Sequence, residues 1–170
     1  MRNNTPEILK HLNLKCFENQ SILENSKKCG CFYCLKIFTP AEITNWINDA
    51  GGKTALCPYC MIDSVIPESD SGDYELNTEL LKDMNKYWTL KYLHLKSFEN
   101  QSILENSKKC GCFYCLKIFT PAEITNWVND VGGKTALCPY CMIDSVIPES
   151  DSGDYELNTE LLKDMNKYWF

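Results

Sequence analysis

The pattern of hydrophobic and polar positions near the start of the chain predicts a short helix. Thr5 precedes Pro6, and a threonine N-cap followed by proline at the first helical position is typical of a helix start. We therefore expect a helix over residues 6–14. The next polar segment, residues 17–28, shows no clear period and predicts no element.

A stronger local pattern follows in the run Thr39-Pro40-Ala41-Glu42. It combines an N-cap threonine, a proline at the first position and a glutamate at the third, as in a capping box. This run predicts a helix to about Asp49, which Gly51-Gly52 would end. The apolar positions of that helix would share one face at helical spacing: Ile43, Trp46 and Ile47.

The remaining pattern predicts short strands, an acidic loop and a final helix. Short extended segments are expected at residues 35–38, 54–56 and 61–66, and residues 67–73 form an acidic, turn-rich loop. Asn77-Thr78 then caps a helix through Trp88. Its apolar pattern continues into the following residues, so we expect the helix to extend through Leu90, Leu93 and Leu95.

The chain is an internal repeat. Residues 9–88 align without gaps to residues 90–169, and only five aligned pairs differ. The five pairs are His11/Tyr92, Asn13/His94, Cys16/Ser97, Ile47/Val128 and Ala50/Val131. Such identity indicates either a recent tandem duplication or a fused tandem, and it predicts two domains, residues 1–88 and 89–170.

Composition and charge exclude several classes of protein. The 170 residues include 17 Lys and Arg against 23 Asp and Glu, a net charge of −6, which argues against a general nucleic-acid or membrane-surface binder. No apolar run approaches the roughly 18 residues needed to cross a bilayer. The first residues lack the apolar stretch of a secretory signal, so a cytoplasmic location is expected.

The cysteines carry the clearest chemistry. The chain has 11, and each repeat holds two Cys-x-x-Cys pairs at a spacing close to that of a zinc ribbon. Four thiolates suit tetrahedral Zn²⁺ and leave no open position, so we expect two structural zinc ions per chain. The predicted ligands are Cys31, Cys34, Cys57 and Cys60, and Cys112, Cys115, Cys138 and Cys141. The predicted fold is α+β: two zinc-ribbon-like domains, each with short strands around a four-cysteine site and two to three helices.

Three further cysteines fall outside this pattern. Cys29 and Cys110 each lie two residues before a predicted ligand. They are either free thiols or alternative ligands, with Cys29 replacing Cys31. Cys16 is replaced by Ser97 in the second repeat, which argues against a ligand role.

Catalysis is not expected. Cys57-Pro58-Tyr59-Cys60 also matches the active-site motif of glutaredoxins, but that fold needs a long helix directly after the motif, and Pro67 arrives seven residues later. The chain's two histidines, His11 and His94, occupy non-equivalent positions, so they cannot belong to a site that both repeats share. A thiol oxidoreductase and a nucleic-acid-associated zinc ribbon remain the alternatives.

The acidic loop is the candidate partner surface. In each repeat the acidic stretch formed by this loop and the two residues after it carries four carboxylates, which are either solvated or a docking surface for a basic protein. The residues are Glu68, Asp70, Asp73 and Glu75, and Glu149, Asp151, Asp154 and Glu156.

Cys29-Gly30-Cys31-Phe32-Tyr33-Cys34, the Cys57-Pro58-Tyr59-Cys60 segment and the closing Lys-Tyr-Trp-Phe together resemble a family of small bacterial cytoplasmic proteins. The resemblance covers nearly all of each repeat. Glycine often follows the second cysteine pair in that family, whereas this chain has Met61. Some members lie near bacterial toxin systems, so the resemblance implies an immunity-type inhibitor. We expect a non-enzymatic protein-binding chain.

Overall fold

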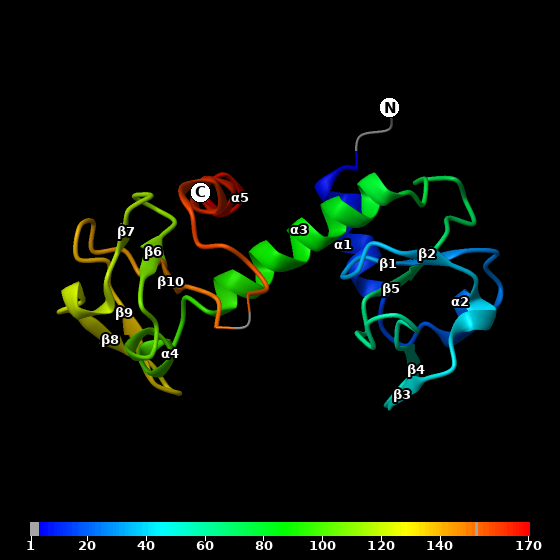
Figure 1. The fold of residues 1–170 in the computed structure, drawn as a ribbon, viewed down its shortest axis with the longest axis horizontal. Helices are drawn as coiled ribbons and strands as arrows, with labels where there is room; N and C mark the ends of the chain where they lie inside the picture. The colour runs from blue at the N-terminus through cyan, green and yellow to red at the C-terminus, as the bar shows by residue number, and fades with distance from the viewer. Residues whose placement is uncertain (1–3, 152) are drawn as a thin grey trace. The chain divides into compact units, whose positions relative to one another are not determined.

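A computed structural model describes residues 4–151 and 153–170, and the chain divides into two compact units. Unit 1 is Met1–Trp88 and unit 2 is Thr89–Phe170. Each unit is a small α+β fold with short antiparallel strands, helices and a cluster of four cysteines (Figure 1). The two units are similar, as their repeated sequences require.

Unit 1 begins with two short helices. Helix α1, Pro6–Leu14, starts as predicted: the Thr5 side chain accepts a hydrogen bond from the backbone N–H of Ile8. Helix α2, Gln20–Glu24, lies in the polar segment that predicted no element.

The strands of unit 1 form two small antiparallel sheets. The first has the order β2-β1-β5, with β1 at Cys29–Cys31, β2 at Ile37–Phe38 and β5 at Val65–Pro67. The second is the hairpin of β3, Trp46–Asp49, with β4, Gly52–Ala55. Both sheets lead directly into the cysteine turns, because β1 ends at one cysteine and β4 ends two residues before another.

The predicted helix from Pro40 to Asp49 is wrong. The capping run forms only one 3-10 turn, η1 at Pro40–Glu42, in which the Glu42 carboxylate accepts hydrogen bonds from the Thr39 N–H at 2.8 Å and hydroxyl at 3.1 Å. Strand β3 then replaces the rest of the helix and pairs along its length with β4. The capping box is thus satisfied within four residues, and pairing between strands takes over after it.

Two hydrophobic cores fill unit 1. The helix-side core joins α1 to α3, Thr78–Leu95, and consists mainly of Leu12, Phe32, Ile66, Leu80, Leu81 and Met84. Figure 1 shows α1 beside the first turns of α3. Gly30 lets β1 approach this helix closely, because an added Cβ would lie 3.0 Å from Leu81. The metal-side core lies around the cysteines and consists mainly of Leu23, Phe38, Ile43, Ala55, Cys57 and Val65.

Unit 2 repeats this plan. Its helices are α4 at Gln101–Glu105 and α5 at Thr159–Trp169, with the 3-10 turn η2 at Pro121–Glu123. Its strands are β6 at Cys110–Cys112, β7 at Ile118–Phe119, β8 at Trp127–Asn129, β9 at Lys134–Ala136 and β10 at Val146–Pro148. The sheet order is again three strands, β10-β6-β7, and a hairpin, β8-β9.

Helix α3 serves both repeats, as the extended apolar pattern predicted. Its first part corresponds in sequence to α5, and its last part corresponds to α1. Leu90 and Leu93 are buried in the core of unit 2, just as Leu12 is buried in unit 1. The chain therefore has no separate counterpart of α1 in its second repeat.

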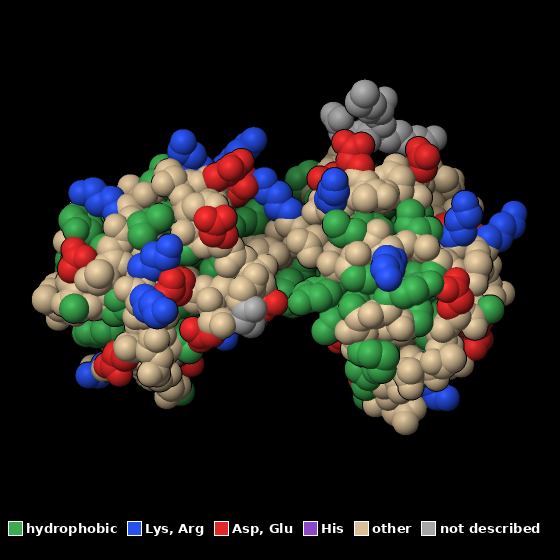
Figure 2. Space-filling model, in the orientation of Figure 1, with side chains coloured by type: hydrophobic (Ala, Val, Ile, Leu, Met, Phe, Trp, Pro, Cys, Tyr) green, Lys and Arg blue, Asp and Glu red, His purple; other side chains and the backbone are tan. Residues whose placement is uncertain are grey.

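Hydrophobic side chains are not confined to the interior. Figure 2 shows them, cysteines included, gathered over the part of unit 1 where Figure 1 labels β1 and β5. Among residues 4–151 and 153–170, no helix is both long and apolar enough to span a membrane.

Candidate metal centre

The first Cys-x-x-Cys turn, residues 31–34, begins at the last residue of strand β1. The N–H of Cys31 donates to the carbonyl of Lys36 at 2.9 Å, and the N–H of Leu35 donates to the carbonyl of Cys31 at 2.9 Å. The N–H of Cys34 points at the Cys31 sulfur, 3.5 Å away. The turn thus places two sulfurs on one side with backbone donors aimed at them.

The second turn, residues 57–60, has the same backbone plan. The N–H of Cys57 donates to the carbonyl of Ile62 at 3.0 Å, and the N–H of Met61 donates to the carbonyl of Cys57 at 2.9 Å. Met61 has a φ of 61°, close to the 62° of Leu35 in the first turn. Methionine therefore adopts here the left-handed conformation that glycine adopts most easily.

The two turns face each other and bring together all four predicted ligands of unit 1. The sulfurs of Cys31, Cys34, Cys57 and Cys60 all lie within 4.8 Å of one another. The cross-turn pairs Cys31–Cys60 and Cys34–Cys57 are each 3.6 Å apart. Sulfurs of a tetrahedral zinc site with Zn–S bonds of about 2.3 Å lie about 3.8 Å apart. The four thiols therefore fit a single ion of this kind.

Unit 2 gathers its four predicted ligands in the same way, with Cys112, Cys115, Cys138 and Cys141 within 4.8 Å of one another. The pair Cys112–Cys141 is 3.7 Å apart and the pair Cys115–Cys138 is 3.6 Å apart. The chain thus carries two groups that could each hold a metal ion.

Burial divides each group into two inner and two outer sulfurs. Cys31 and Cys57 are buried, whereas Cys34 and Cys60 are partly exposed. The inner sulfur of Cys31 also lies 3.2 Å from the hydroxyl of the buried Ser64. That hydroxyl can donate to a thiolate and so helps to orient the ligand.

The pKa of Cys34 is shifted in the opposite direction from those of Cys31 and Cys60. Burial opposes ionisation of Cys34, but hydrogen bonds from the Lys36 N–H and from neighbouring thiols outweigh it and lower its pKa. Burial raises the pKa of Cys31, and it raises that of Cys60 to about 11. A bound cation would have to displace these protons, since metals take cysteine as the thiolate.

The structure leaves the other cysteines out of these groups. Cys29 and Cys110, considered as alternative ligands, are fully buried, and each thiol lies 3.5 Å from a strand carbonyl, that of Phe38 or Phe119. Burial raises the pKa of each to about 12. Cys16 is buried in the helix-side core.

A buried asparagine supports the site and was missed by the sequence analysis. The Asn19 side chain is fully buried and bonds to three backbone groups of three separate segments. It lies in the polar segment without a period, and nearly every position is repeated, so neither pattern nor repetition distinguished it. Asn100 makes the same three bonds in unit 2.

Hydrogen bonds within the fold hold part of the acidic loop. The Glu68 carboxylate accepts hydrogen bonds from the N–H groups of Lys27 and Lys28, and Glu149 accepts one from Lys108. Asp70 and Glu75 remain exposed, as do Asp73, Asp151, Asp154 and Glu156. Glu68 and Glu149 thus hold the loop in place, while the exposed carboxylates can face a partner.

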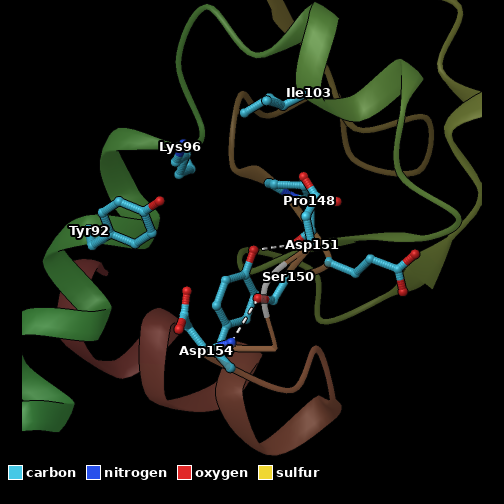
Figure 3. Close-up of a pocket in the computed structure, with 9 residues that line it drawn as sticks. Tyr92, Lys96, Ile103, Pro148, Ser150, Asp151 and Asp154 are labelled. Atoms are coloured by element: carbon cyan, nitrogen blue, oxygen red, sulfur yellow. Dashed lines mark hydrogen bonds between the residues drawn. The ribbon is translucent and has the colours of Figure 1, made fainter. Parts of the chain in front are cut away.

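In unit 2 this loop borders a cavity of about 80 Å³. Figure 3 shows Tyr92 from helix α3 and Lys96, the residue after the end of that helix, on one side of it, with Asp151 across from them and Asp154 below Tyr92. The Lys96 ammonium lies 5.2 Å from the centre of the Tyr92 ring. Three of the four predicted acidic residues of this repeat, Glu149 among them, therefore line one hollow.

No helix follows the second turn directly. Residues 61–64 are irregular and lead into β5, and the corresponding residues of unit 2 lead into β10. A helix that begins at the motif is one of the arrangements that lower the pKa of a redox cysteine.

Comparisons of the chain with models of protein families, with curated proteins and with solved structures gave no match.

Proposed function

We propose that the chain is a non-enzymatic protein-binding protein in which one structural Zn²⁺ holds each unit together. The observation that carries this proposal is the group of four cysteine sulfurs within 4.8 Å of one another in each unit. Four thiolate ligands fill a tetrahedral site and leave no position for a substrate or a reacting water. Domains of about this size bury little core and often need such a staple.

The partner in this proposal is a basic protein. The chain has a net charge of −6, and a zinc ion bound by four thiolates would add a further double negative charge in each unit. Exposed carboxylates such as Asp70 and Glu75 would speed the association of a basic partner. The resemblance to proteins near toxin systems makes an immunity-type inhibitor of a bacterial toxin or effector the most concrete form of this function.

Native mass spectrometry of the full chain, purified without added metal, tests the metal part of the proposal. We expect two zinc ions per chain with all thiols reduced. Cys34→Ser should leave one zinc ion, and the double variant Cys34→Ser with Cys115→Ser should leave none. Cys29→Ala is the matched control and should keep two, because Cys29 lies outside the group. A metal-free chain with disulfides would contradict the proposal and favour a redox role for Cys57 and Cys60.

Affinity capture with the zinc-loaded chain tests the partner part. We expect one basic protein to bind, with an association rate that falls as salt is added. Replacing exposed loop carboxylates, as in Asp70→Asn with Asp151→Asn, should slow association. Tight binding to DNA or RNA with a steep salt dependence would instead favour the nucleic-acid alternative.

A further inference from the structure

The residue after each cysteine pair has the same strained backbone but a different environment. Leu35 and Met61 have φ values of 62° and 61°, and their counterparts Leu116 and Met142 have 65° and 63°. This left-handed conformation costs a residue with a side chain about 1–2 kcal/mol, whereas glycine adopts it freely. Both cysteine turns of each unit therefore carry this strain.

Burial offsets the strain in one turn only. Leu35 is partly buried and packs against the helix-side core. Met61 is 50% exposed, and its sulfur accepts one long hydrogen bond, from the Asn45 side chain at 3.9 Å. Met142 is likewise 50% exposed. Strained residues whose side chains gain no compensating burial are typical of binding and catalytic sites.

A rigid aromatic ring lies beside the exposed methionine. Tyr59 is 49% exposed, yet three neighbours fix its ring. Its hydroxyl donates to the Glu42 carboxylate at 2.6 Å, the ring of Phe38 meets it edge-on at 5.7 Å, and the Lys36 ammonium lies 4.0 Å from its centre. A fixed aromatic ring next to a flexible methionine is the kind of surface that anchors protein partners. The ring loses little conformational freedom on binding, and the methionine can adapt its shape to the partner.

The charges around this surface favour a basic partner. The partly exposed sulfurs of Cys34 and Cys60 belong to the same pair of turns, and with zinc bound the four thiolates carry a double negative charge. Glu42 adds a carboxylate at the hydroxyl of Tyr59, and Lys36 is the cation placed over the ring. The sum is negative, as it is for the whole chain.

From these observations we infer that Tyr59 and Met61 in unit 1, with Tyr140 and Met142 in unit 2, form a docking surface for a basic and apolar segment of the partner. An apolar side chain of that segment packs against the methionine, and a lysine or arginine lies near the outer sulfurs. This inference rests on the proposed function and names the surface and chemistry through which it acts.

The test uses the zinc-loaded full chain labelled with ¹³C at its methionine methyl groups. A random peptide library is selected on the chain, and the strongest peptide is titrated while the methyl resonances are followed. We expect enriched peptides to combine basic and apolar residues. The resonances of Met61 and Met142 should shift, while those of Met84 and Met165 should stay, because both are fully buried in the cores.

Two sets of variants sharpen the result. Met61→Gly with Met142→Gly relieves the backbone strain, so the variant should be at least as stable. Its affinity should fall at least about tenfold, as expected on truncating an anchor side chain. Lys36→Ala with Lys117→Ala should strengthen the binding of a basic peptide, because it removes a like charge beside the ring. Lys53→Ala with Lys134→Ala changes the net charge equally on β4 and β9 and should strengthen it less.

Enrichment of acidic peptides, or unchanged affinity in the double glycine variant, would overturn the assignment of this docking surface. Neither result would contradict the proposed function. Failure of any peptide to bind would count against both. Sedimentation of the free chain supplies a further check. Concentration-dependent dimers that shift the Met61 and Met142 resonances would show that a second copy covers the surface, which also overturns the inference.

Discussion

The side-chain oxygen of Asn19 accepts a hydrogen bond from the backbone N–H of Ala55 at 3.0 Å, two residues before Cys57, one of the four cysteines that could hold a metal ion. The amide nitrogen of Asn19 donates to the carbonyls of Cys16 at 3.1 Å and Val65 at 2.9 Å. One buried side chain thus ties the start of α2, strand β4 and strand β5 together. Strand β4 leads into the second cysteine turn, so this asparagine helps to hold that turn in position.

Asn19→Ala should destabilise unit 1 by about 3–5 kcal/mol, because it removes three hydrogen bonds and leaves buried backbone groups of β4 and β5 unpaired. Urea unfolding of the zinc-loaded chain would show a separate transition at lower denaturant for that unit. Asn25→Ala is the control: Asn25 also bonds to a carbonyl, that of Ser21, but it is exposed. Its effect should stay within about 0.5 kcal/mol. Equal effects of the two substitutions would show that burial of Asn19 does not matter.

Metal removal should unfold both units. Apparent binding energies of structural zinc are about 10–16 kcal/mol in small domains. They are comparable to the whole free energy of unfolding of an ordinary domain, roughly 5–15 kcal/mol, and larger than a small core supplies. Circular dichroism during titration with a strong chelator should show loss of structure, and added Zn²⁺ should restore it. A chain that keeps its structure and its melting temperature without metal would contradict a structural role for the ion.

The two strained turns should respond to glycine with opposite signs. Met61→Gly should raise the stability of unit 1 by up to about 1 kcal/mol, since it relieves strain and removes a half-exposed side chain. Leu35→Gly relieves the same strain but loses packing against the helix-side core, so it should destabilise by about 1–3 kcal/mol. Chemical denaturation of both variants in the zinc-loaded state measures the pair. If both substitutions raised stability, the packing of Leu35 against the helix-side core would contribute less than the strain costs.

Acid should weaken unit 2 through His94, a residue that unit 1 replaces with Asn13. The His94 ring stacks on Trp169 with ring centres 3.7 Å apart, and burial lowers its pKa although Asp144 opposes the shift. The unfolded histidine therefore binds a proton more readily than the folded one. Stability is complete above the unfolded pKa of about 6.5 and falls as the pH drops below it toward the folded value.

His94→Asn, which copies unit 1, isolates this effect. The variant loses the ring stacking at every pH, so the informative quantity is the difference in unfolding free energy between the natural chain and the variant. That difference should move in favour of the variant between neutral and mildly acidic pH. A difference that stays constant with pH would exclude His94 as the cause.

The sequence by itself determined the features that depend on neighbours along the chain. The repeat, the four cysteines of each group, the N-cap of α1 at Thr5 and the length of α3 all follow from local spacing, and the structure has them. A cysteine pair with two residues between its members can form its turn from its own backbone hydrogen bonds, so its geometry needs little from the rest of the fold.

Only the tertiary structure decided the features that depend on a distant partner. The run that begins at Thr39 satisfies its capping box in one 3-10 turn, and Trp46–Asp49 then pairs with Gly52–Ala55. Gly51 therefore lies in the turn of a hairpin and Gly52 begins its second strand, whereas the sequence predicted that both would end a helix. That strand is held by Asn19, more than thirty positions earlier in the chain. Local propensity cannot predict a long-range hydrogen bond of this kind, because the bond contributes energy only when the two segments are in contact in the folded chain.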